Sequence, residues 1–191
     1  MKKLIFLVIL VLVGSTIEAQ NFRWGVTAGA NLSSIGGDDP DDPEIRTGLN
    51  IGGVADIGIS DDFSVQPEIR FSMRGWKEGD FTAKINYIDI PVAADYEVVD
   101  GLSLQAGPLI GFVVSDEGEF DGNDLGSIEG LETFNFGALV GAQYEFSNGL
   151  YLQARYDMGF IDLFDNFDAK PCNISFNLGY MFNAGGGGSA E

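Results

Sequence analysis

The chain has 191 residues, of which 27 are glycine and 15 are phenylalanine, and it carries a formal net charge of −19 with no histidine. One domain accounts for this length, and the abundance of glycine and phenylalanine indicates a β-rich fold rather than a helical one. The acidity argues against nucleic acid as a partner, because a polyanion needs a basic surface. The lack of histidine removes Ser-His dyads and imidazole acid/base catalysis, so we expect no catalytic residues and no enzyme activity.

Both ends of the chain are predicted to lie outside the folded domain. Lys2 and Lys3, the apolar run at 4–13 and the small residue Ala19 follow the order of a secretory signal, so residues 1–19 are predicted to be a cleaved signal peptide. The apolar run is short for a spanning helix, and a retained anchor is the alternative. Residues 184–191 are similar to a flexible linker of engineered origin. The folded domain is therefore expected at 20–183.

Between these ends, eight segments have an apolar residue at every second position, which is the periodicity of a strand with one apolar and one polar face. In chain order they are 22–32, 49–59, 63–74, 87–98, 102–114, 134–146, 150–160 and 174–182. The polar faces are rich in glycine. Four of the connections are long and polar, and most of them are acidic: 33–44, 76–83, 115–132 and 161–171.

The other connections are short. Phe146 and Leu150 keep their side chains on one face only if the three residues between them form a turn, with Gly149 in the left-handed conformation. The same spacing recurs at 59–63 and 98–102. Short turns at one end of eight strands and long loops at the other are typical of a bacterial outer-membrane barrel. We therefore predict an all-β, eight-stranded antiparallel up-and-down transmembrane barrel, with short periplasmic turns and long acidic extracellular loops.

Periodicity alone does not say which face of the strands points outward. The apolar face is almost free of charge, and its aromatic residues gather near strand ends, as Trp24, Phe112 and Tyr180 do. Such a distribution suits a lipid-facing surface with two aromatic girdles. A soluble periplasmic binding barrel of the lipocalin kind, with the opposite polarity, is the alternative.

The polar face is then expected to fill the interior, because a barrel of eight strands leaves room only for its own side chains. The third and seventh strands stand opposite each other in such a ring. Counted from their turns, Glu68 and Arg70 lie at about the height of Arg155 and Asp157. We predict that these four residues form a cross-lumen charge cluster with a structural role, rather than one in proton or ligand chemistry.

We expect no metal or other cofactor. Carboxylates at 38–44 and 116–132 are of the type that binds calcium, but Asp121-Gly122-Asn123-Asp124 is only a fragment of a calcium-loop pattern, so solvated loop charge is the favoured interpretation. Cys172 has no second cysteine with which to form an internal disulfide. Its expected role is packing or contact with lipid.

Several stretches together resemble the outer-membrane β-barrel domain proteins of Bacteroidota, the PorT-like group of porin-family proteins. They are WGVTAGANLSSI at 24–35, FSVQPEIRFSMRG at 63–75, INYIDIPVAADY at 85–96, GLSLQAGPLIGF at 101–112, NGLYLQARYDMG at 148–159 and the terminal FNLGYMF. The resemblance implies export by the general secretory route, integration into outer-membrane lipid and folding by the barrel assembly machinery. It also implies a terminal barrel-insertion signal formed by Phe176, Leu178, Tyr180 and Phe182. PorT itself is linked to protein secretion in complexes.

The leading functional hypothesis is a small integral outer-membrane protein with a plugged interior. It would act as a structural or accessory subunit of a larger complex of outer-membrane or periplasmic proteins, or it would present its loops at the cell surface. A narrow pore for small solutes is the alternative within the membrane. The soluble binding barrel remains the alternative outside it.

Overall fold

The computed structural model describes residues 22–37, 43–164 and 169–183. The predicted signal peptide at 1–19 and the predicted linker at 184–191 lie outside the described residues. No helix in the described part of the chain is long and apolar enough to cross a membrane.

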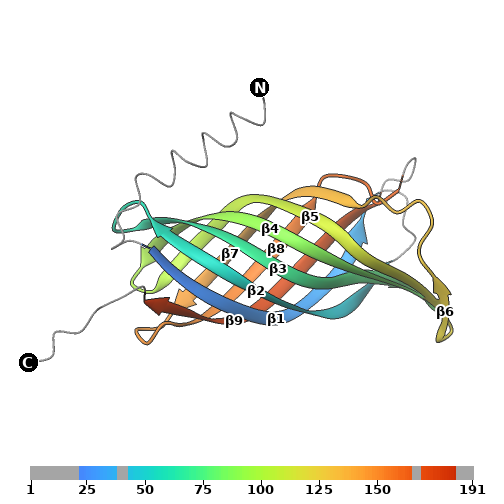
Figure 1. The fold of residues 1–191 in the computed structure, drawn as a ribbon, viewed down its shortest axis with the longest axis horizontal. Helices are drawn as coiled ribbons and strands as arrows, with labels where there is room; N and C mark the ends of the chain where they lie inside the picture. The colour runs from blue at the N-terminus through green and yellow to red at the C-terminus, as the bar shows by residue number, and fades with distance from the viewer. Residues whose placement is uncertain (1–21, 38–42, 165–168, 184–191) are drawn as a thin grey trace, which may run out of the picture.

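Nine antiparallel strands make up the described structure, and eight of them close into a barrel (Figure 1). They are β1 (Phe22–Gly36), β2 (Glu44–Gly58), β3 (Phe63–Glu78), β4 (Phe81–Val99), β5 (Leu102–Phe120), β6 (Asn123–Gly126), β7 (Phe134–Glu145), β8 (Leu150–Gly159) and β9 (Lys170–Asn183). Each barrel strand pairs with its sequence neighbours in the ring, and β1 pairs with β9 to close it. The predicted eight-stranded barrel is confirmed, and β6 is an addition outside the ring.

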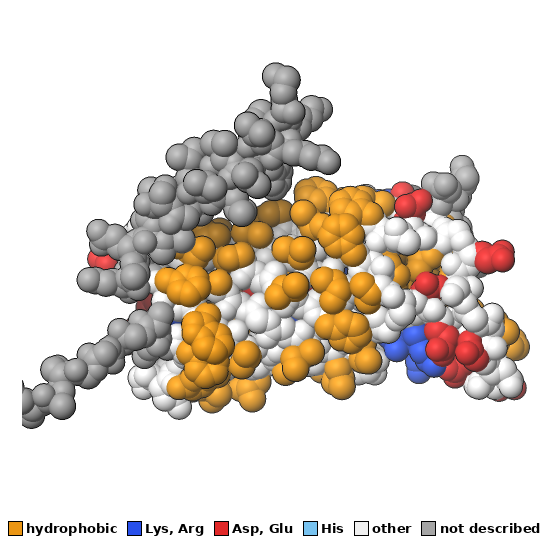
Figure 2. Space-filling model, in the orientation of Figure 1, with side chains coloured by type: hydrophobic (Ala, Val, Ile, Leu, Met, Phe, Trp, Pro, Cys, Tyr) orange, Lys and Arg blue, Asp and Glu red, His pale blue; other side chains and the backbone are white. Residues whose placement is uncertain are grey.

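The exterior of the barrel is apolar over its middle height, and charged side chains gather beyond one end of this zone (Figure 2). Ile51, Leu152 and Leu178 are each more than half exposed, although they belong to regular strands. A charged side chain on such a surface would cost about 2–4 kcal/mol at the middle of a bilayer. The strand alternation therefore directs the charged residues inward and the aliphatic residues toward lipid.

Aromatic pairs mark both edges of the apolar zone. Near the short turns, Trp24 stacks on Phe182 with ring centroids 4.2 Å apart, and Tyr144 lies 4.9 Å from Phe146. Toward the other end, Phe112 lies 5.6 Å from Phe134. Two such girdles are typical of a barrel that spans a bilayer, because aromatic side chains settle at the membrane–water interfaces.

Glycine on the inner face makes room for large side chains. A Cβ added at Gly141 would lie 2.6 Å from the Cγ of Arg155, and one added at Gly179 would collide with the ring of Tyr151. Arg155 and Tyr151 are 2% and 1% exposed. The glycine-rich polar face thus leaves space for a few large groups to fill a narrow lumen.

The turn between β7 and β8 is as predicted, with Phe146 N donating to Leu150 O at 2.8 Å and Gly149 at φ 85°. At 98–102 the prediction of a three-residue turn is wrong. There Val99 pairs with Leu102, and the register shifts between Glu97 and Val99. The shift absorbs the extra residue and leaves Asp100 and Gly101 as the turn.

The predicted loops at 33–44, 76–83 and 115–132 are shorter in the structure, because the strands run on beyond the apolar zone. β3 and β4 meet at a tight turn that contains Gly79 at φ 55°. β5 continues to Phe120 and then reverses into β6. Polar contacts between strands replace apolar alternation in this part: Asn86 Nδ2 donates to Ser115 Oγ at 2.7 Å, and Lys84 pairs with Glu117.

Candidate functional site

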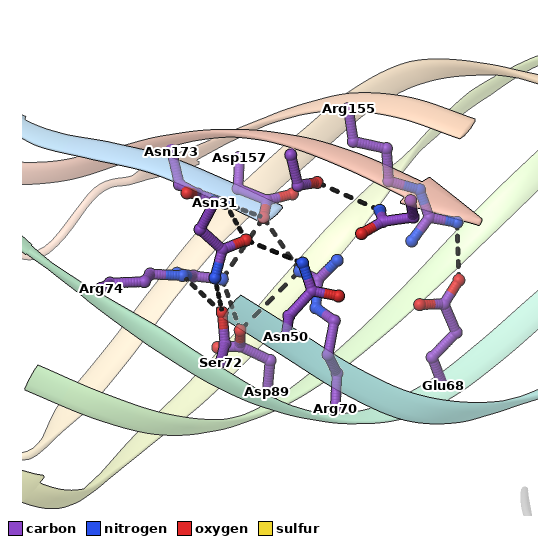
Figure 3. A network of polar contacts seen from close by, with 12 residues as sticks. Asn31, Asn50, Glu68, Arg70, Ser72, Arg74, Asp89, Arg155, Asp157 and Asn173 are labelled. Carbon is purple, nitrogen blue, oxygen red and sulfur yellow. Dashed lines mark hydrogen bonds and ion pairs between the residues drawn. The ribbon is translucent and has the colours of Figure 1, made fainter. Parts of the chain in front are cut away.

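The charged residues predicted from the sequence to cluster lie inside the barrel, at the middle height of the lumen. Six charged side chains, at most 4% exposed, form what we call the central ion-pair cluster: Glu68, Arg70, Arg74, Asp89, Arg155 and Asp157. They come from β3, β4 and β8, which places them on opposite walls of the lumen (Figure 3).

The four residues predicted to meet across the lumen form two separate ion pairs. Arg155 Nη2 lies 2.6 Å from Glu68 Oε1, and Arg70 Nη2 lies 2.9 Å from Asp157 Oδ2. Each pair joins β3 to β8, so each crosses the lumen. No ion pair among the described residues links one of these pairs to the other.

Arg74 and Asp89 belong to the same cluster, and sequence analysis did not include them. Arg74 Nη2 contacts Asp89 Oδ2 and lies 3.3 Å from Asp157 Oδ2, while Arg70 Nη2 lies 3.7 Å from Asp89 Oδ2. Two arginines thus face two aspartates in a four-membered arrangement. The available signal was strand register, because Arg70 and Asp89 are direct neighbours on β3 and β4.

Neutral polar side chains surround this arrangement. Asn173 Nδ2 donates to Asp157 Oδ2 at 3.3 Å, and Arg74 Nε donates to Ser72 Oγ at 3.1 Å. Asn31 Nδ2 also donates to Ser72 Oγ, at 2.9 Å. These contacts hold the charged groups in place from several strands at once.

The cluster is electrically balanced, since three arginines face three carboxylates. Taking charges out of water is unfavourable unless each finds a partner, and removal of one partner from a buried pair costs about 3–5 kcal/mol. In this cluster every charged side chain has a partner of opposite charge within 4 Å. The cluster leaves no net charge to attract an ion into the centre of the barrel.

A ring of carboxamides lies next to the cluster on the side of the short turns. Gln105 Nε2 donates to Gln66 Oε1 at 3.0 Å, and Gln153 Nε2 donates to Gln143 Oε1 at 3.0 Å. Arg155 Nε donates to Gln105 Oε1 at 2.8 Å, which connects the ring to the cluster. The ring narrows the lumen below the ion pairs.

A vestibule opens beneath this ring, between the short turns. The cavity measures about 500 Å³, and its lining is acidic, with Asp56, Asp95 and Glu145 among its walls. Arg23 bridges two strands there, with Nη2 2.6 Å from Asp56 Oδ2 and Nη1 2.5 Å from Glu145 Oε1. The lumen is therefore open to water at the end that carries the short turns.

The opposite end of the lumen is closed by what we call the apolar cap, which sequence analysis did not anticipate. Its members are buried and hydrophobic, and they are Ile35, Trp76, Ala83, Ile85, Tyr87, Leu163 and Ala169. Ile128 and Leu131, from the segment that follows β6, pack against it. Glu132 N donates to Leu163 O at 2.9 Å, so two extracellular connections join over the lumen.

The charges beyond the apolar zone are arranged differently. Lys84 Nζ lies 2.8 Å from Glu117 Oε1 and contacts Glu119 Oε2. Hydrogen bonds to Glu117 and Glu119 raise the pKa of Lys84 above the ordinary value for lysine. This small network lies on the extracellular extension of β4 and β5, where all its members are at least partly exposed.

The remaining residues considered in the sequence are those of β9, Cys172 and the loop carboxylates. Phe176, Leu178 and Tyr180 point outward from β9 and are 40–56% exposed, and Phe182 stacks on Trp24. Cys172 Sγ lies 3.5 Å from Ser34 O. Within the described ranges, no three histidine, cysteine or acidic residues are grouped so that they could hold a metal ion.

Comparison with known proteins agrees with this architecture. Residues 18–165 match the family model described as the outer membrane protein beta-barrel domain. The attachment invasion locus protein Ail of Yersinia pestis has a similar structure, with a TM-score of 0.54 and 16% identity over 84% of this chain and 98% of that one.

Neisserial surface protein A gives a TM-score of 0.57 and 15% identity, over 83% of this chain and 97% of that one. At these identities the likeness shows the fold alone. No curated protein matches the chain. The family match covers most of the chain and agrees with the closed eight-stranded ring, the lipid-suited exterior and the two aromatic girdles. The chain therefore belongs to the outer membrane protein beta-barrel domain family and is a β-barrel protein of the outer membrane.

Proposed function

We propose that this protein is a non-conducting outer-membrane barrel that presents its extracellular strands to partners, as a surface protein or as an accessory subunit of a complex. It is not an enzyme in this proposal. The observation that carries the proposal is the closure of the lumen at two levels. The central ion-pair cluster fills the middle, and the apolar cap covers the extracellular end.

The physical reason is that an ion crossing this lumen would have to displace paired charges and then pass an apolar layer. The side chains of the cluster are at most 4% exposed, and Ala83, Ile85 and Tyr87 in the cap are at most 1% exposed. An ion in such surroundings loses its hydration without finding a free countercharge. The extracellular strands, by contrast, extend well beyond the apolar zone and are freely accessible.

The route to the membrane is part of the proposal. The chain is exported with a cleaved signal at 1–19, and the barrel assembly machinery inserts it by its last strand. The support is the outward row of Phe176, Leu178 and Tyr180 on β9, which pairs with β1 where the ring closes. The finer relationship to PorT-like proteins of Bacteroidota rests on the series of motifs in the sequence.

Conductance across a planar lipid bilayer tests the proposal. We expect the purified barrel to give no steady ionic current. A variant that opens both levels, with Trp76→Ala, Arg70→Ala and Asp157→Ala, should give current steps, which shows that inserted barrels are detected. A steady open current from the unaltered protein would contradict the proposal.

A narrow pore for small solutes is the second candidate, and the vestibule is the observation that favours it. A cavity of about 500 Å³ already leads from the periplasmic end to the glutamine ring. The pore hypothesis requires the cap to open. Liposome swelling with small sugars and amino acids distinguishes the two, because only a pore would let them enter.

A further inference from the structure

The end of β5 and the strand β6, residues 115–126, form a hairpin at the extracellular tip of the molecule (Figure 1). Among the described strands β6 pairs only with β5, and it is the last strand in the sheet order. All four residues of β6 are exposed. No described strand pairs with its outer edge, although Gly126 N donates to Asp124 Oδ1 at 2.7 Å, and such an edge is a template for the addition of another strand.

Two carboxylates lie opposite each other beside this edge. Glu119 of β5 stands directly opposite Asp124 of β6. Lys84 is the nearest cation in the network, but it lies between Glu117 and Glu119 on the side away from β6. Like charges at directly opposed positions of an antiparallel pair are destabilising. A basic residue placed next to Asp124 on the free side would relieve this repulsion.

The same edge carries an apolar side chain that lipid does not explain. Leu125 of β6 is 63% exposed, and Phe120, which ends the neighbouring strand β5, is 52% exposed. Leu125 sits where the register between β5 and β6 shifts, next to Asp124. A strand added here would meet a carboxylate at one position and an apolar side chain at the next.

We propose that the free edge of β6 binds an extended polypeptide segment in which basic residues alternate with apolar ones. A second copy of this chain does not fit the same edge, because it would bring another Asp124 and further carboxylates against the first set. The inference rests on the proposed function, since it assumes that the hairpin is presented to partners, and it names the chemistry of the partner.

Fluorescence anisotropy tests the inference with the full barrel in lipid nanodiscs. The probe is a short labelled peptide of alternating lysine and valine. We expect saturable binding that weakens about tenfold or more in Asp124→Lys, because a favourable charge pair becomes a repulsive one. Glu44→Lys is the matched control, since it makes the same change in net charge at the exposed extracellular end of β2, which pairs with β1 and β3 and not with β6. It should bind the peptide nearly as well as the unaltered barrel.

Backbone pairing is tested separately with a peptide of the same sequence that is N-methylated at alternate residues, which removes hydrogen bonds of the ladder. It should lose binding to the unaltered barrel, and the parent peptide should slow amide exchange in residues 123–126. Equal binding by Asp124→Lys, equal loss in Glu44→Lys or full binding of the methylated peptide would each overturn the inference. Nanodiscs leave both ends of the barrel accessible, so this result is independent of the conductance that tests the proposed function.

Discussion

The central ion-pair cluster and the extracellular hairpin use the same residue types under opposite conditions. In the cluster, each arginine faces a carboxylate in the buried middle of the lumen, and the charges balance. At the hairpin, two glutamates of β5 share Lys84 of the neighbouring strand β4, and Glu119 still faces Asp124. The difference is that the buried charges are paired with one another, whereas the exposed charges stay in contact with water.

The largest expected effect comes from breaking a buried pair. Arg155→Met leaves Glu68 as an unpaired carboxylate in the lumen, which should lower the free energy of unfolding by about 3–5 kcal/mol. Urea unfolding in lipid vesicles measures the change. The double variant Arg155→Met with Glu68→Gln should recover a large part of the loss, because no buried charge is left alone. Unchanged stability in the single variant would contradict the structural role of the cluster.

A smaller effect is expected at the rim of the vestibule, where water competes for the charges. The side chain of Arg23 is 34% exposed while it bridges Asp56 and Glu145. Arg23→Met should therefore lower the free energy of unfolding by about 1–2 kcal/mol, less than the buried pair. The same urea experiment serves here. If Arg23→Met lowered the free energy of unfolding as much as Arg155→Met does, the expected difference between buried and rim ion pairs would be contradicted.

At the hairpin we expect almost no change in stability. Lys84→Met removes an exposed network whose side chains are 29–43% accessible, and exposed ion pairs contribute little because water and salt screen them. Global unfolding should be the same within error, in low and high salt. A strong, salt-dependent destabilisation would mean that the hairpin is part of the folding core rather than a presented surface.

The smallest effect concerns pH. The pKa of Lys84 is raised by Glu117 and Glu119. The ion pair is therefore complete below the pKa of an unfolded chain and is lost only as the pH rises through the higher pKa of the folded state. Lysine ¹³C NMR, with Lys84→Met to assign the signal, should place the midpoint above 10.5. A midpoint at or below that value would contradict the pairing.

The sequence predicted the barrel because the lipid-facing positions impose an unbroken alternation on every strand. It also placed Glu68, Arg70, Arg155 and Asp157 at a common height, since height above a short turn can be counted in residues, but it did not assign the two separate pairs. Arg74 and Asp89 were missed because only the opposite strands β3 and β8 were compared, whereas Asp89 lies on β4 directly beside Arg70 of β3.

The apolar cap and the extension of β5 could not be predicted from the alternation of residues along a strand. Ile35, Trp76 and Ile85 of the apolar cap occupy the same inward positions as the polar lumen residues, so alternation alone assigns them to a polar face. The extension of β5 has polar residues on its outer face, because no lipid surrounds it, and its acidic composition indicates a loop. Pairing between strands shapes both regions, and a single strand does not reveal it.

The contrast between the buried cluster and the exposed hairpin depends on which face of the strands points outward. In this account, outward leucines contact lipid and inward side chains fill the lumen. Methyl NMR in nanodiscs, with leucine labelled and acyl chains detected through nuclear Overhauser effects, measures this orientation directly. Leu152 and Leu178, about half exposed, should contact the acyl chains, while Leu109 and Leu139, which are 0% exposed, should not. Acyl-chain contacts at Leu109 and Leu139, with none at Leu152 and Leu178, would contradict the account.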